Sequence, residues 1–136
     1  VLKVAIGSFD THSEQFWRHR DLLRELDESL YETVQALKNI GIWNDTVIMT
    51  YSEFGRRAAE NGSRGTDHGM AAPHFLMGGK LKGGFVGKVP NLGRLRNNNL
   101  EFEIDYRTVY ETVLREHFGL DDNPFQKYQN KGLFSL

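Results

Sequence analysis

The strongest regularity in the order of apolar and polar residues lies between residues 13 and 40. Large aliphatic side chains recur there at spacings of three and four positions, at Leu22, Leu23, Leu26, Leu30, Val34, Leu37 and Ile40. This spacing is typical of an amphipathic helix with one apolar face. The pattern predicts a helix from about Ser13 to Asn39, and Gly41 is placed to end it.

Three short apolar runs flank or follow this helix and predict β-strands. They are Leu2 to Ile6 in VLKVAIG, Thr46 to Tyr51 in DTVIMTY, and roughly His74 to Met77 in PHFLMGG. The order strand, helix, strand within about 50 residues is typical of a right-handed βαβ unit with parallel strands. We therefore predict an α/β fold, in which a mostly parallel sheet has flanking helices and the first two strands end side by side.

A long loop and a second helix are predicted in the rest of the chain. Residues 52–72 are rich in glycine, serine, asparagine and aspartate without a sustained period, and long loops in compact domains are often functional. In DYRTVYETVLREHFG, Asp105 is placed to cap a helix that ends before Gly119. The residues predicted to face inward are Tyr106, Val109, Tyr110, Val113 and Leu114.

The chain has no internal repeat and no linker, which predicts a single α/β domain over residues 1–136. It begins at Val1 without an initiator methionine, and the first strand is predicted from the outset. We therefore expect residues 1–136 to be the C-terminal part of a larger domain.

Composition narrows the classes of function. Lysine and arginine number 17 against 18 aspartate and glutamate residues, so the net charge of -1 offers no basic surface for nucleic acid or an anionic membrane. The absence of cysteine excludes disulfides, thiolate nucleophiles and zinc fingers. No apolar run reaches the roughly 20 residues that a membrane span needs. These features favour a soluble domain without a nucleic-acid partner.

Potential metal ligands follow both strands of the predicted βαβ unit, at the sheet edge where α/β folds bind ligands. Asp10 and His12 follow the first strand and point to the same side of an extended segment, and Glu53 follows the second. The long loop then brings Asp67 and His68 in GTDHG, between glycines that allow close backbone approach. Carboxylates and imidazoles without sulfur suit zinc best, then manganese or iron(II), with calcium less well matched.

Each of these residues also has a simpler interpretation. Asp10 and His12 are equally compatible with a helix-capping turn. Glu53 with an arginine of the following pair, Arg56 or Arg57, would make an exposed ion pair of about 0–1 kcal/mol. Asp67 with His68 would form an Asx turn with a solvent-facing imidazole. Convergence of the donors at one place distinguishes the metal site from these alternatives.

Several motifs together resemble a known family. They are DTH, TYSEFGRR, ENGSRGTDHG, GGKLKGGFVG and DYRTVY. In this order they resemble the C-terminal half of a bacterial sulfatase-like family of unknown function in the alkaline phosphatase superfamily, over nearly the whole chain. The resemblance implies that Asp10, His12 and His68 bind one metal and that Glu53 binds a second. Phe54 departs from it, because relatives often have a histidine or asparagine donor there.

The resemblance implies a metal-dependent hydrolase of phosphate or sulfate esters, acting on a small molecule or a polysaccharide. Bound metal would lower the pKa of a water or alcohol nucleophile toward about 7, and Arg56 would bind a substrate oxygen. No catalytic nucleophile is assigned, because the resemblance locates it in an N-terminal half. The chain alone is therefore expected to have little or no activity.

Two further expectations complete the sequence analysis. The alternative function is a metal-stabilised binding or scaffold domain without turnover, and a plain α/β domain that binds no metal is a third reading. The resemblance also implies a periplasmic or extracellular location, because relatives are often exported by the twin-arginine route.

Overall fold

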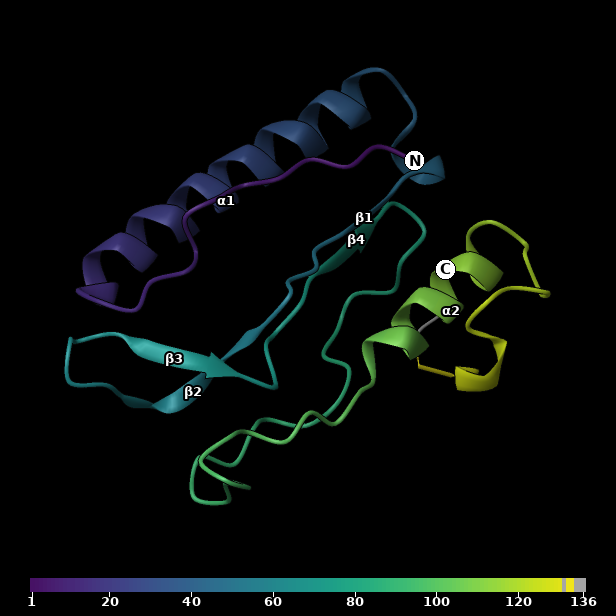
Figure 1. Cartoon of the computed structure of the whole chain (residues 1–136). Helices are drawn as coiled ribbons and strands as arrows, with labels where there is room; N and C mark the ends of the chain where they lie inside the picture. The colour runs from purple at the N-terminus through teal and green to yellow at the C-terminus, as the bar shows by residue number, and fades with distance from the viewer. Residues whose placement is uncertain (131, 134–136) are drawn as a thin grey trace.

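The computed structural model describes residues 1–130, 132 and 133, and consists of two α-helices with short strands and two single-turn helices (Figure 1). In chain order the elements are α1 (Gln15–Asn39), η1 (Trp43–Asp45), β1 (Val47–Met49), β2 (Gly55–Glu60), β3 (Thr66–Gly69), β4 (Leu76–Gly78), α2 (Tyr106–Glu116) and η2 (Gln126–Tyr128).

Helix α1 confirms the predicted amphipathic helix and its stop. Gly41 has a φ of 77°, a left-handed conformation that glycine adopts without steric cost. Its N–H donates to the carbonyl of Lys38 at 3.0 Å, and the N–H of Ile42 donates to Leu37 at 3.1 Å. This pair of bonds is the Schellman motif, which satisfies carbonyl groups left free at a helix end.

The start of α1 differs from a side-chain-capped helix. Its N-cap residue is Glu14, and no side chain accepts a hydrogen bond there. Instead the N–H groups of Glu14 and Gln15 donate to the carbonyls of Ser63 and Arg64, at 3.0 and 2.9 Å. A distant loop therefore takes the place of a capping side chain, and Asp10 is not the helix cap.

The strands form two antiparallel pairs, so the predicted parallel α/β sheet is wrong. Strand β1 pairs with β4, with Val47 opposite Gly78 and Met49 opposite Leu76. Strands β2 and β3 form a separate pair. The reason lies in the connection from β1 to β4, which holds the β2–β3 hairpin rather than a crossover helix. The chain can then return beside β1 in the opposite direction.

The predicted first strand, Leu2 to Ile6, is also absent as a strand. In Figure 1 this N-terminal segment runs alongside α1 without joining a sheet. The ammonium of Lys3 lies 5.4 Å from the centre of the Tyr51 ring, so the segment does lie near the end of the β1 region. An apolar run indicates a tendency toward burial, but it does not specify which backbone will pair with it.

Burial in the described residues is unusual for a domain of this size. No apolar side chain among residues 1–130, 132 and 133 is buried, and the buried residues are two glycines, Gly55 and Gly65, with Thr11, Glu111 and Thr112. The apolar stripe that defines α1 is at most half-buried, and Leu23 and Ile40 are exposed. Within the same residues, neither helix combines the length and apolar character needed to cross a membrane.

Helix α2 begins where the sequence predicts. Asp105 accepts a hydrogen bond from the backbone N–H of Arg107 at 2.9 Å, which is the expected N-cap bond. Beyond the helix, Gly119 has a φ of 67°. The predicted inward face is half-buried apart from Tyr106, which is 60% exposed.

Candidate metal centre

Three of the predicted ligands meet at one point on the surface. Nε2 of His12 and Nε2 of His68 lie 3.1 Å apart. Oδ1 of Asp10 lies 2.9 Å from the first of these nitrogens and 2.8 Å from the second. Asp10 and His12 belong to the segment before α1, whereas His68 lies on β3. The structure therefore brings together a carboxylate and two imidazoles from distant parts of the chain.

Arg56 on β2 joins the two segments that supply these ligands. Its Nη2 donates to the carbonyl of Phe9 and its Nη1 to the carbonyl of Thr66, each at 2.6 Å. Phe9 directly precedes Asp10, and Thr66 lies two residues before His68 on β3. The guanidinium thus holds both sides of the triad in place, because its N–H groups form a rigid planar fork.

Asn61 and Gly65 make a second connection, in the turn between β2 and β3. The Asn61 amide donates to the carbonyl of His12 at 3.0 Å, and its oxygen accepts from the backbone N–H groups of Ser63 and Gly65. A side chain at Gly65 would overlap the carbonyl group of His12. The close backbone approach predicted from the glycines of GTDHG is therefore confirmed at Gly65.

The spacing of the triad suits a metal ion with nitrogen and oxygen ligands. Ligands at about 2.0–2.2 Å from a tetrahedral zinc ion lie roughly 3.3–3.6 Å from one another. The donor atoms of Asp10, His12 and His68 are slightly closer than that, so binding would require a small outward movement. These side chains are 58%, 48% and 45% exposed, which gives an ion and a further ligand access from solvent.

The charges around Asp10 favour its ionised form. The hydrogen bond with His68 lowers the pKa of Asp10, and the nearby charges of His12, His68 and Arg56 act in the same direction. Nη2 of Arg56 lies 3.6 Å from Oδ1 of Asp10. Asp10 is therefore ready to bind a cation without first losing a proton.

The other predicted site residues lie outside the triad. Oδ1 of Asp67 lies 3.7 Å from Nδ1 of His12, on the opposite side of that ring from Nε2. Asp67 is thus placed to orient His12 rather than to share its ion. Glu53 is exposed and does not belong to the group of converging donors. Arg56, predicted to bind substrate, is instead bonded to two backbone carbonyls.

Phe54, which offers no donor atom to an ion, contacts the triad. Its ring stacks on the imidazole of His68, with centroids 3.8 Å apart and an angle of 5° between the ring planes. The sequence held one indication of this contact. Phe54 and Arg56 are two positions apart, so they share a face of an extended segment. Asn61 had no comparable signal.

His19 is a second residue whose place only the structure reveals. It lies on α1 with its ring in edge contact with Phe9, at a centroid distance of 5.7 Å. Burial lowers its pKa, and the charge of Arg56 lowers it further. His19 therefore packs beneath the segment that holds Asp10.

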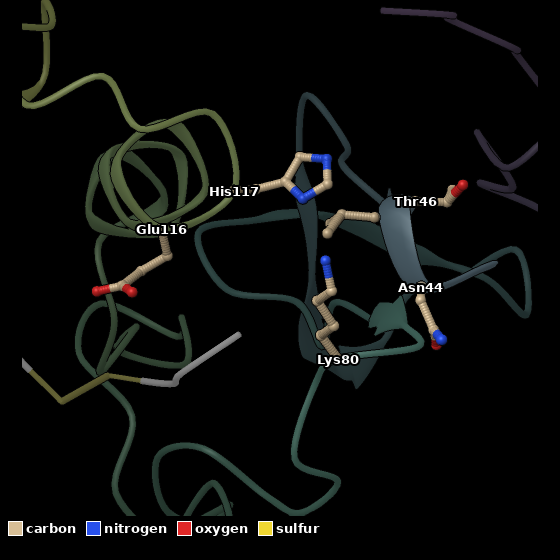
Figure 2. A pocket seen from close by; sticks show the side chains of 6 residues that line it. Asn44, Thr46, Lys80, Glu116 and His117 are labelled. Atoms are coloured by element: carbon tan, nitrogen blue, oxygen red, sulfur yellow. The ribbon is translucent and has the colours of Figure 1, made fainter. Parts of the chain in front are cut away.

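A separate polar cavity of about 110 Å³ lies between β1, the residues after β4 and the end of α2 (Figure 2). Figure 2 shows the nitrogens of Lys80 and His117 turned toward the space between them, whereas the carboxylate of Glu116 points away. Lys80 is already paired with Asp45 at 3.0 Å. The cavity therefore lacks the convergence of free donors found in the triad.

The fold and the site together define a small mixed helical and antiparallel-strand structure with a candidate metal centre on its surface. The chain belongs to the family described as "Protein of unknown function (DUF1501)", which it matches over residues 1–136. A search of curated proteins and a search of solved structures found no match.

The predicted membership of a sulfatase-like family is therefore wrong, because no sulfatase or alkaline phosphatase family is found. The resemblance rested on short motifs of aspartate, histidine and glycine. Such motifs reflect ligand chemistry and close backbone approach, which unrelated folds share.

Proposed function

We propose that Asp10, His12 and His68 bind one divalent metal ion, zinc being the best match to a carboxylate and two imidazoles. The observation that carries this proposal is the convergence of three donor atoms, all within 3.1 Å of one another, from segments 56 or more residues apart. Without a cation, only protons would lie between the two imidazole nitrogens and the carboxylate oxygen.

We further propose that this ion serves metal-dependent hydrolysis of phosphate or sulfate esters. Three protein ligands leave a coordination position for water, as in catalytic rather than structural zinc sites. The exposure of the triad supports access by a substrate. A divalent ion and Arg56 together carry more positive charge than Asp10 and Asp67 neutralise, which favours an anionic substrate.

Within that mechanism, each residue at the site has a definable role. Bound metal would supply a nucleophilic water of lowered pKa and neutralise charge on the ester. Asp10 contributes negative charge that retains the ion, and Asp67 orients His12 through the nitrogen that faces away from the triad. Arg56 fixes the geometry and adds positive charge at the edge of the site.

A second candidate function is a metal-stabilised binding or scaffold domain without turnover. It is favoured by the absence of fully buried apolar side chains among residues 1–130, 132 and 133. A metal that joins residues 10 and 12 to residue 68 would add folding free energy that such a structure otherwise lacks.

Elemental analysis of protein purified without added metal tests the shared part of both proposals. We expect about one zinc or manganese per chain, and its loss in Asp10→Ala but not in His117→Ala. Hydrolysis of aryl phosphates and aryl sulfates, with and without a chelator, then separates the two functions. Chelator-sensitive turnover supports the hydrolase, whereas metal that raises the melting temperature without turnover supports the scaffold. Unchanged metal content in Asp10→Ala would contradict both.

A further inference from the structure

Phe54 makes the flattest aromatic contact in the part of the chain that the structure describes, and it makes it with a proposed ligand. The Phe54 and His68 rings are nearly parallel, with an angle of 5° and a centroid separation of 3.8 Å. Phe54 directly precedes β2, and His68 lies on the neighbouring strand β3, where it pairs with Arg56 of β2. The stack therefore joins the two strands on the face that carries the triad.

The Phe54 ring is itself held in place. The hydroxyl of Ser52 donates to the carbonyl of Phe54 at 2.9 Å and faces its N–H at 3.4 Å. The guanidinium of Arg56 lies 5.1 Å from the ring centre, within the range of a cation–π contact. Next to it, Gly55 is buried, and a side chain there would overlap the carbonyl of Ala71. The backbone under Phe54 thus has little freedom to move.

A fixed ring matters because His68 is otherwise free to turn. Its side chain is 45% exposed, and its polar contacts, with Asp10 and His12, both involve Nε2. Stacking confines the imidazole to one plane and keeps Nε2 directed at the other two donors. A ligand that is already oriented loses less side-chain entropy when the ion binds.

We propose that Phe54 is a positioning residue, which orients His68 for metal binding through ring stacking. This inference rests on the proposed metal centre, because it assigns a role only if His68 is a ligand. The aromatic ring donates nothing to an ion, and it acts by fixing the residue that does.

The test compares Phe54→Leu, which removes the ring at similar volume, with Phe54→Tyr, which keeps it. Phe85→Leu is the matched control, because Phe85 is fully exposed. Zinc affinity is measured by calorimetric titration, and the ligand geometry by the visible absorption of bound Co²⁺. The ring-proton shifts of His68 are followed by NMR in metal-free protein, where a stacked phenyl ring displaces them.

We expect Phe54→Leu to weaken zinc binding about 10–100-fold, the range typical of losing a group that orients a metal ligand. It should also alter the Co²⁺ spectrum and remove the displaced His68 shifts, whereas Phe54→Tyr restores all three and Phe85→Leu changes none. If Phe54→Leu does not fold, Phe54→Met replaces it, and circular dichroism verifies the helices.

The outcomes separate this inference from the function on which it rests. Equal zinc affinity in the wild-type protein and in Phe54→Leu would overturn the role of Phe54 and leave the metal centre intact. Wild-type protein that binds neither zinc nor Co²⁺ would overturn the metal centre, and the positioning role with it. Undisplaced His68 shifts in metal-free wild-type protein would show that the stack does not exist in solution.

Discussion

Two regions rich in polar contacts, the triad region and the α2 region, differ in how far apart the contacting residues lie in the sequence. In the triad region, residues 9–15 and 54–69, Asp10 contacts a histidine 58 positions away. Arg56 reaches a carbonyl 47 positions away, at Phe9. In Figure 1 these segments come together at the end of α1 that lies near the β2–β3 hairpin.

In the α2 region, residues 105–123, the contacts are local. Asp105 pairs with Arg107, two positions on, through the N-cap and the guanidinium. Glu111 pairs with Arg115 at 3.1 Å, one helical turn further along. Contacts of this kind form within a single helix and need no other part of the chain.

The difference indicates which contacts in this protein serve function and which serve stability. Local contacts decide where α2 begins and where α1 ends. The long-range contacts assemble chemically active groups, and each depends on several others being in place. Changes in the triad region should therefore affect metal binding strongly, whereas changes in the α2 region should affect only stability.

The largest expected effect is that of His68→Ala. It removes one of three proposed ligands, so zinc affinity should fall more than about 100-fold, beyond the range typical of losing an outer partner. Isothermal titration of zinc measures this. His117→Ala, beside the cavity of Figure 2, is the control and should leave zinc affinity unchanged. Equal affinity in both variants would remove the distinction between the two regions.

The next largest effect is expected for Gly65→Ala. The new methyl group would overlap the carbonyl of His12, so the hairpin and the triad segment must move apart. We expect a loss of about 1–3 kcal/mol in the free energy of unfolding, as for other overpacked sites, together with weaker zinc binding. Urea denaturation measures the first quantity.

Gly62→Ala is the control for this prediction, because it lies in the same turn with open space around its Cβ position. It should change the free energy of unfolding by less than about 0.5 kcal/mol. Similar losses in both variants would mean that the close contact at Gly65 is not what joins the two segments.

Asp67→Asn should have a smaller effect on zinc binding. The substitution keeps the shape of the side chain and removes the charge that faces Nδ1 of His12. We expect zinc affinity to fall about 10-fold, at the low end of the range for groups that orient a ligand. A fall as large as that of His68→Ala, measured by the same titration, would instead make Asp67 a direct ligand.

The smallest effect concerns Asp105 and should appear only in stability. The hydrogen bond with Arg107 lowers the pKa of Asp105, so the charged form stabilises the folded state. That stabilisation is present above the unfolded pKa of about 3.9 and is lost as the pH falls through the lower folded pKa. Asp105→Ala should cost about 1 kcal/mol at pH 7, typical of a lost N-cap.

Asp105→Asn sharpens this prediction, because it keeps a capping oxygen without the charge. Urea titrations at pH 7 and pH 3 give the free energy of unfolding of each protein. The difference between Asp105→Asn and wild type should be smaller at pH 3 than at pH 7. Zinc affinity should be the same in all three proteins at pH 7. A loss of zinc binding in either variant would show that the α2 region is coupled to the triad.

The same contrast explains which structural predictions succeeded. The stop of α1 at Gly41 and the start of α2 at Asp105 depend on bonds to residues at most five positions away. Those interactions can be inferred from a short window of sequence. Strand pairing cannot, and β1 joined β4 in the antiparallel direction because the intervening residues formed a hairpin rather than a crossover.

The predictions about the candidate site also divide into those that a short window of sequence supports and those that it does not. Residue types and spacing identified Asp10, His12 and His68 as donors suited to zinc, but they gave Glu53 and Asp67 equal standing. Spacing also could not reveal that Phe54 would stack on His68 or that Arg56 would bond to Phe9. The first contact depends on the register of β2 with β3, and the second on how the segment before α1 lies against β2.

The sequence alone determined the two helices, the end of α1, the start of α2 and the set of groups with metal-binding chemistry, because these follow from side-chain identity and from contacts a few residues apart. The tertiary structure decided the direction of strand pairing and the membership of the triad. It did so because closing a loop of more than 50 residues costs entropy that no local pattern offsets. The bonds of Arg56 and Asn61, the backbone bonds from Glu14 and Gln15, and the close approach at Gly65 together hold that loop closed at the triad.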